Sequence, residues 1–187
     1  MDLSLTQSQE MLKATVQQFV QRENSKEVLL ELEKTDTGCT PALWGKAASL
    51  GWLGMVVPEE YGGVGASLTD AAVLFQELGR GPVQGPYFSS GVLGAMILQE
   101  GASEKQKQEL LPLVCNGGVT LSVAITEPGY GWGPDFVQMD ATLDGKDYVL
   151  NGIKLFVPDA SMASHFVCVV RTGNTTNCQD NISLVLV

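Results

Sequence analysis

The sequence predicts an α+β fold, in which an all-helical N-terminal domain is followed by a small antiparallel, β-barrel-like domain. Through about the first 115 residues, apolar side chains recur at spacings of three and four, as in amphipathic helices. After Gly118 the pattern changes to short β-rich runs separated by turn residues. A helical block followed by a strand block is typical of α+β proteins or of two segregated domains. We therefore expect a helical domain over 1–117 and a β-domain over 118–187.

Five helices are predicted in the first block. Leu12, Val16 and Phe19 fall on one face of the first helix, and Thr6 and Gln9 can form a capping box at its start. The later helices begin at a capping hydroxyl, and several end at a glycine. They are expected over 40–51, 67–79, 85–100 and 103–115.

The second block contains strand-like runs and two hairpin-like turns, Asp144-Gly145 and Asn151-Gly152. The sequence stops inside the last apolar run, whereas domains usually close at exposed, polar positions. We therefore expect the chain to be a piece of a longer protein. Strands are predicted over 119–125, 137–143, 148–150, 153–157, 166–170 and 182–187.

Composition excludes several classes of partner. The chain has 11 Lys and Arg against 21 Asp and Glu, a formal net charge of −10, which repels nucleic acids and anionic membranes. The sequence has no signal-like segment and no apolar run near the roughly 20 residues that a spanning helix needs, so we expect a cytoplasmic protein. No metal site or disulfide framework is expected, because the cysteines are scattered and there is a single histidine. The four thiols, expected to be reduced, are Cys39, Cys115, Cys168 and Cys178.

One loop in the second block is a candidate ligand site. A predicted strand leads to Thr126, and glycines follow at alternate positions: Gly129, Gly131 and Gly133. Such a loop lets the backbone approach a ligand and turn amides toward anionic oxygens, although an ordinary Gly/Pro turn is the alternative. The Rossmann dinucleotide fingerprint is excluded, because the glycine spacing is wrong and a proline follows instead of a helix.

A second segment, 150–159, could present Phe156 to a planar ligand, or Phe156 could be an interior residue. We interpret Lys154 as a solvated strand residue and His165 as structural. With one histidine, no Ser–His–Asp or Cys–His catalytic set can be assembled. The residues by themselves thus indicate a two-part fold with a small-ligand loop.

Several linked motifs run along the chain in order. They are LGWLG at 50–54, VPEEYGGVG at 57–65, ELGR at 77–80, EKQK at 104–107, AITEPGYG at 124–131 and LNGIK at 150–154. In these motifs and their order, nearly the whole chain resembles the acyl-CoA dehydrogenase family of flavoproteins. The resemblance implies that a C-terminal four-helix domain would follow the two domains seen here.

The resemblance also implies a reaction. A carboxylate removes the α-proton of an acyl-CoA thioester, and the β-hydrogen leaves as hydride to N5 of FAD, giving a trans-2-enoyl thioester of fatty acid metabolism. An electron-transfer flavoprotein or similar acceptor reoxidises the flavin, and the protein is a homo- or hetero-oligomer. The base lies in the missing C-terminal domain in this family, so no catalytic residue is expected in this chain. We expect residues 1–187 alone neither to turn over substrate nor to hold FAD tightly.

Site residues follow from the resemblance position by position. Thr126 should bond the pyrimidine side of the flavin, and Phe156 should lie against the isoalloxazine where the family often has tryptophan. The helical stretch near Ser89, Ser90 and Leu93 should approach the acyl chain. Cofactor contacts are expected at Val123, Ile125, Thr126, Gly131, Trp132, Phe156, Val157 and Pro158.

Two departures from the family pattern leave the activity open. The residues after Gly131 lack the Ser-Asp pair that contacts cofactor phosphate, and Pro158 replaces a Thr or Ser that reaches toward N5. We favour a divergent but active dehydrogenase. The alternatives are a non-catalytic subunit of a mixed oligomer and a flavin monooxygenase on the same scaffold.

Overall fold

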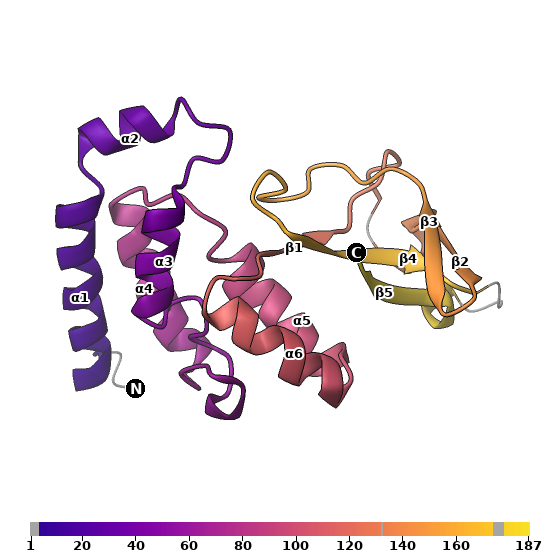
Figure 1. Ribbon diagram of the computed structural model, residues 1–187, viewed down its shortest axis with the longest axis horizontal. Coiled ribbons are helices and arrows are strands. Elements are labelled where there is room, and N and C mark those ends of the chain that lie inside the picture. The colour runs from indigo at the N-terminus through magenta and orange to yellow at the C-terminus, as the bar shows by residue number, and fades with distance from the viewer. Residues whose placement is uncertain (1–3, 132, 174–177) are drawn as a thin grey trace.

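The computed structural model of the protein describes residues 4–131, 133–173 and 178–187. The molecule is elongated, with helices at one end and a sheet at the other (Figure 1). The predicted helical domain followed by a sheet domain is confirmed. The helices are α1 (Gln7–Glu23), α2 (Lys26–Leu32), α3 (Pro41–Ser49), α4 (Leu68–Arg80), α5 (Ala95–Gly101) and α6 (Glu104–Cys115).

Side-chain caps fix where the helices begin. The Thr6 hydroxyl accepts a hydrogen bond from the Gln9 backbone amide, and the Gln9 side-chain oxygen accepts one from the Thr6 backbone amide. These two bonds form the predicted capping box. Ser67 and Ser103 form the same capping box at α4 and α6, whereas at α3 the Thr40 hydroxyl alone accepts from the Leu43 amide. The pattern did not predict α2, because seven residues are too few for a helical period to stand out.

The predicted helix over 85–100 is divided in two. It begins as a π-helical segment, η2 (Ser89–Gly94), and continues directly into α5. The segment η2 packs against the first strand, where the Ser90 hydroxyl accepts a hydrogen bond from the Leu121 amide at 3.0 Å. This contact joins the helices to the sheet.

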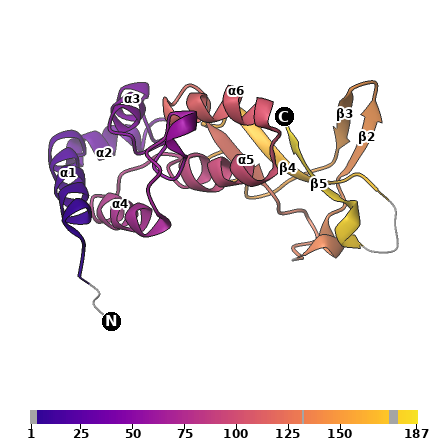
Figure 2. The same ribbon diagram turned by 90° about the horizontal axis from the view of Figure 1, so that it is seen from below.

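Two apolar clusters occupy the helical end. In the first, Phe19 meets Trp52 edge to face at 4.8 Å, and the Trp44 indole donates to the Gly117 carbonyl at 3.2 Å. The second lies between α5, α6 and the sheet and includes Leu111 and Leu121, both fully buried. In the view from below, α5 and α6 lie beside the sheet (Figure 2). These two helices pack against it through the second cluster.

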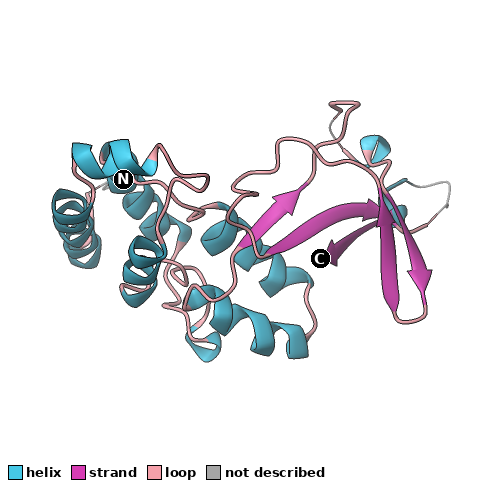
Figure 3. Ribbon diagram, turned by 45° about the horizontal axis from the view of Figure 1, so that its top comes forward, coloured by secondary structure: helices cyan, strands magenta, loops and turns pink. Residues whose placement is uncertain are grey.

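The sheet is mixed, whereas the sequence pattern predicted antiparallel pairing throughout. Its strands are β1 (Leu121–Ala124), β2 (Asp140–Asp144), β3 (Asp147–Asn151), β4 (His165–Arg171) and β5 (Ile182–Leu186). The central strand β4 runs parallel to β1 and antiparallel to β5, and β2 and β3 form a hairpin at its far end (Figure 3). The long connection between β1 and β4 brings the chain back in the direction of β1, which makes that pairing parallel.

The predicted strand over 153–157 is wrong. This stretch is irregular, because Phe156 has a positive φ of 49° that no regular strand accommodates. Ile153 and Phe156 are mostly exposed, and the Leu155 amide bonds to the Thr126 carbonyl at 2.7 Å. The segment therefore runs beside the glycine loop and is bonded to it at more than one point.

Cys39, Cys115 and Cys168 are buried and form no disulfide, and the side chain of Cys178 lies outside the described part. Within the described ranges, no helix is both long enough and apolar enough to cross a membrane. No group of three or more His, Cys, Asp or Glu side chains among these residues is placed to hold a metal ion.

Candidate functional site

A pocket of about 280 Å³ opens where the chain leaves the C-terminal end of β1. Its walls come from two segments, the glycine loop that follows β1 and the irregular stretch before β4. It is lined by Ile125, Thr126, Tyr130, Gly131, Gly133, Phe136, Val137 and Phe156. Four of the predicted cofactor residues, Ile125, Thr126, Gly131 and Phe156, are thus brought together.

The glycine loop turns tightly to form the first wall. The Tyr130 amide donates to the Glu127 carbonyl at 2.9 Å, and Tyr130 has a φ of 51°. Gly131 follows, packed against the Phe136 ring so closely that a Cβ atom there would lie 1.7 Å from a ring carbon. Only glycine fits this position, because any side chain would displace Phe136 from the wall of the pocket.

Two aromatic rings stand at the opening. Phe156 is 78% exposed and Tyr130 is 63% exposed, and their ring centroids are 6.1 Å apart with an interplanar angle of 35°. Both residues have a positive φ, which is costly for side chains of this size and is held only where the surroundings impose it. Exposed apolar rings on strained backbone are typical of ligand sites.

Thr126 provides the polar group of the pocket. Its backbone carbonyl accepts a hydrogen bond from the Leu155 amide, and this bond fixes Thr126 between the two walls. Thr126 lines the pocket, and its hydroxyl makes no hydrogen bond to another residue that the structure describes. A hydroxyl both donates and accepts, so Thr126 can serve a ring N–H or a ring carbonyl.

A buried ion pair lies beneath the loop. Lys154 Nζ is 2.6 Å from Glu127 Oε1, and the two side chains are 5% and 8% exposed. The Gln138 and Met139 amides also donate to the Glu127 carboxylate. Burial acts to raise the pKa of Glu127, but the Lys154 hydrogen bond and the two amides outweigh it and hold the pKa below its ordinary value. The interpretation of Lys154 as a solvated strand residue is wrong, because this carboxylate draws it inward.

Three other predicted cofactor residues that the structure describes, Val123, Val157 and Pro158, are not among the lining residues. Val123 is buried in β1, and Val157 packs against the core of the sheet. Pro158 is exposed, and its carbonyl accepts a hydrogen bond from the Ser122 hydroxyl. Trp132 lies outside the described residues.

The predicted substrate residues lie on η2, away from the pocket lining. Ser89 and Ser90 are buried, and both hydroxyls are engaged within the protein, with the Asp159 carboxylate and the Leu121 amide respectively. Leu93 is half-buried. The two serines connect η2 to the segment after Phe156 and to β1.

Sequence reasoning missed Tyr130, Phe136, Glu127 and Lys154 as parts of the site. A signal was present for the aromatic pair, since large apolar residues are unusual in a loop rich in glycine and proline. No sequence signal pairs Glu127 with Lys154, because 27 residues separate them and only the return of the chain brings them together.

Comparison with known proteins finds relatives along nearly the whole chain. Residues 6–118 match the family model of the acyl-CoA dehydrogenase N-terminal domain, and residues 122–187 match that of the middle domain. A probable acyl-CoA dehydrogenase of Bacillus subtilis, YngJ, is 32% identical over 191 residues, which cover 100% of this chain and 49% of that protein. The chain spans half or less of the length of the curated relatives it matches first.

Two solved structures extend the likeness to the fold. A chain of the ChsE4–ChsE5 complex of Mycobacterium tuberculosis superposes with a TM-score of 0.84 at 26% identity, covering 100% of this chain and 48% of that one. The structure of PigA with FAD and proline gives a TM-score of 0.83 at 25% identity, covering 100% and 49%. With both domains matched in order along nearly its whole length, this chain belongs to the acyl-CoA dehydrogenase family.

Proposed function

We propose that this chain supplies the helical and middle domains of an FAD-dependent enzyme that dehydrogenates the α,β-bond of an acyl-CoA thioester. One observation carries the proposal: Ile125, Tyr130, Phe136 and Phe156 are all large, apolar and exposed, and all line one open pocket. Covering exposed apolar surface contributes about 25 cal/mol per Å², so these side chains favour a flat ring that packs on them.

The lining suits an isoalloxazine. Phe156 and Tyr130 offer ring faces, the Thr126 hydroxyl can serve the polar pyrimidine edge, and Gly131 allows the backbone to come close. When bound, the flavin accepts the hydride that leaves the β-carbon as the α-proton is removed. The residues of this chain hold the ring and exclude water from one of its faces. We propose that the base lies outside residues 1–187.

Pro158 has neither hydroxyl nor N–H, so we assign it no hydrogen bond to the cofactor. We assign the approach to the acyl chain to Leu93 on η2, because the hydroxyls of Ser89 and Ser90 are taken within the protein. Acyl-CoA is the proposed substrate and an electron-transfer flavoprotein the proposed acceptor. We retain the division into domains over 1–117 and 118–187 as part of this proposal.

A second candidate function is that of a non-catalytic subunit in a mixed oligomer. The missing hydroxyl at Pro158 favours it, and one related structure is a complex of two named proteins. The two candidates share the FAD pocket and differ in turnover.

The test uses the intact protein, purified and examined for the visible absorption of flavin, then given a panel of acyl-CoA thioesters with an artificial electron acceptor. The proposal expects bound FAD that is bleached by at least one thioester, with an enoyl-CoA product. Bound FAD without bleaching would favour the non-catalytic subunit, and oxygen consumption by the reduced protein would indicate a monooxygenase. An intact protein that binds no FAD overturns the proposal.

A matched pair of variants tests the pocket itself. Phe156→Ala removes an exposed ring from the wall and should weaken FAD binding about tenfold, which corresponds to about 1.4 kcal/mol. Phe88→Ala is the control, because Phe88 is also an exposed phenylalanine with a ring neighbour at 6.1 Å, but it lies outside the pocket. Equal FAD affinities of the two variants would contradict the assignment of the site.

A further inference from the structure

We propose that Glu127 and Lys154 form a positioning clamp that holds the two walls of the pocket in register and thereby sets its affinity for a planar ring. The inference rests on the proposed function, since it assigns the ring to the same pocket. It concerns two residues that do not line the pocket themselves.

Glu127 closes the glycine loop at its base. Its Oε2 accepts from the Gln138 amide at 2.9 Å, and its Oε1 accepts from the Met139 amide at 3.1 Å. Glu127 begins the loop, and residues 138 and 139 end it. One carboxylate therefore fixes the separation of the two ends, between which Tyr130, Gly131 and Phe136 are carried.

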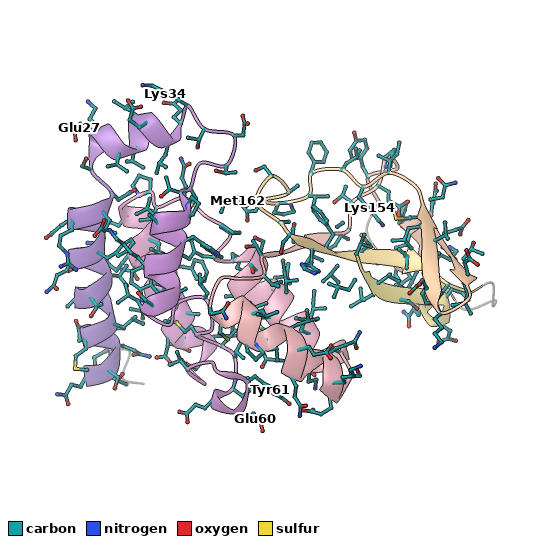
Figure 4. The ribbon with its side chains drawn as sticks, viewed as in Figure 1. Glu27, Lys34, Glu60, Tyr61, Lys154 and Met162 are labelled. Carbon is teal, nitrogen blue, oxygen red and sulfur yellow. The ribbon has the colours of Figure 1, made fainter. Side chains whose placement is uncertain are left out.

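Lys154 ties the second wall to the first. Its ammonium group bonds to Glu127 Oε1 at 2.6 Å and to the Ile125 carbonyl at 3.3 Å. Lys154 lies among the loop segments at the sheet end of the molecule (Figure 4). The next residue, Leu155, donates its amide to the Thr126 carbonyl, and Phe156 follows at the pocket. The Lys154 side chain and this backbone bond together set how far Phe156 stands from the glycine loop.

The clamp also lies next to both strained residues. Tyr130 is three positions after Glu127 and bonds to the Glu127 carbonyl, and Phe156 is two positions after Lys154. A positive φ at a large side chain costs on the order of 1–3 kcal/mol and relaxes unless its neighbours are fixed. Fixing the residues at the base of each turn is what keeps both rings at the opening.

Direct contact between Lys154 and a ligand is excluded by burial. Its side chain is 5% exposed, and its ammonium group is occupied by the carboxylate and a carbonyl. A buried pair of this kind contributes little net stability compared with apolar residues, and its better attested role is to specify one arrangement. Lys154 is therefore a positioning residue, acting through Phe156 and Thr126.

The experiment compares five forms of the intact protein: wild type, Lys154→Met, Glu127→Gln, Lys154→Arg and the double variant of the first two substitutions. Lys46→Met is the matched control, because Lys46 pairs with Glu23 at 2.5 Å on the helical end, where the side chains are 50% and 26% exposed. Two quantities are measured well below the unfolding temperature: FAD affinity, and amide hydrogen exchange at Gln138, Met139 and Leu155.

Lys154→Met and Glu127→Gln should each weaken FAD binding at least about tenfold and speed exchange at those three amides, while amides of α3 and α4 stay unchanged. Lys154→Arg should retain part of the FAD affinity and part of the slow exchange at the three amides. The double variant should be no worse than the worse single variant, since the two residues act as one unit. If Lys154→Met fails to fold, Glu127→Gln, which keeps the side-chain size and one of the two acceptor oxygens, decides the test.

Wild-type FAD affinity in both single variants, or exchange that rises equally throughout the protein, overturns the clamp. If the wild type itself binds no FAD, the proposed function fails, and with it the link between the clamp and ring affinity. The exchange measurement then still decides whether the pair holds the two segments together.

Discussion

The substitution Gly63→Ala tests the tight packing of the loop between α3 and α4. In this loop the motif VPEEYGGVG folds back on itself. A Cβ atom at Gly63 would lie 2.0 Å from the Val57 carbonyl oxygen and 2.5 Å from its carbonyl carbon. Val57 is fully buried, and its carbonyl accepts a hydrogen bond from the Gly65 amide at 2.8 Å. The obstacle is backbone in a packed core, so it cannot rotate aside as a flexible side chain could.

The expected cost follows from these contacts. Relieving the overlap requires the Val57 carbonyl to move by about 1 Å or more, which disturbs the core by about 1–3 kcal/mol. The move also breaks the bond to Gly65, worth about 1 kcal/mol net. Gly63→Ala should therefore destabilise the protein by about 2–4 kcal/mol and lower its Tm by roughly 5–15 °C.

Urea unfolding followed by the fluorescence of the core tryptophans measures this change, with an unchanged m-value as the check on two-state behaviour. Two alanine variants serve as controls. Gly62 has a φ of 82° and open space around it, so Gly62→Ala should cost only about 1–2 kcal/mol, from the backbone alone. Gly79 lies inside α4 with nothing near, and Gly79→Ala should stabilise by about 0.5–1 kcal/mol. A loss below about 1 kcal/mol for Gly63→Ala would refute the reasoning.

Three further predictions concern the site and its support. Ser90→Ala leaves the buried Leu121 amide without its acceptor and should cost about 1–3 kcal/mol in urea unfolding; no loss would argue against a structural role for this hydroxyl. Gly131→Ala should displace the Phe136 ring and weaken FAD binding of the intact protein, as measured by flavin fluorescence, with little change in stability. The pKa of Glu127 is lowered in the folded state, so its contribution to stability is full above its ordinary pKa and is lost as the pH falls through the lower, folded value. Stability measured across that acidic range should fall less steeply for Glu127→Gln than for wild type.

Helix starts were predictable because they depend on neighbouring residues. Thr6, Thr40, Ser67 and Ser103 cap their helices through amides three residues away, within reach of a local pattern. The strand predicted over 153–157 failed for the opposite reason. Its apolar alternation resembles a strand, but contacts with the loop 29 residues earlier impose a positive φ at Phe156.

Four of the residues predicted to contact the cofactor line the pocket. Sequence motifs located these four residues, Ile125, Thr126, Gly131 and Phe156, because the glycine loop and the later aromatic residue can be recognised from the sequence alone. Val123 and Val157 do not line the pocket, because all four residues of β1 are buried and Val157 packs against the core of the sheet.

The sequence by itself determined that a helical block precedes a strand block, the family, and the two segments that line the candidate site, since each depends on local spacing and on motifs. The tertiary structure alone decided that β4 returns parallel to β1, that Tyr130 and Phe156 share one opening, and that Glu127 and Lys154 meet beneath it. The physical reason is distance along the chain. Contacts between residues 26 to 44 positions apart depend on where the whole connection is anchored, and that is settled by packing against the helices and the sheet.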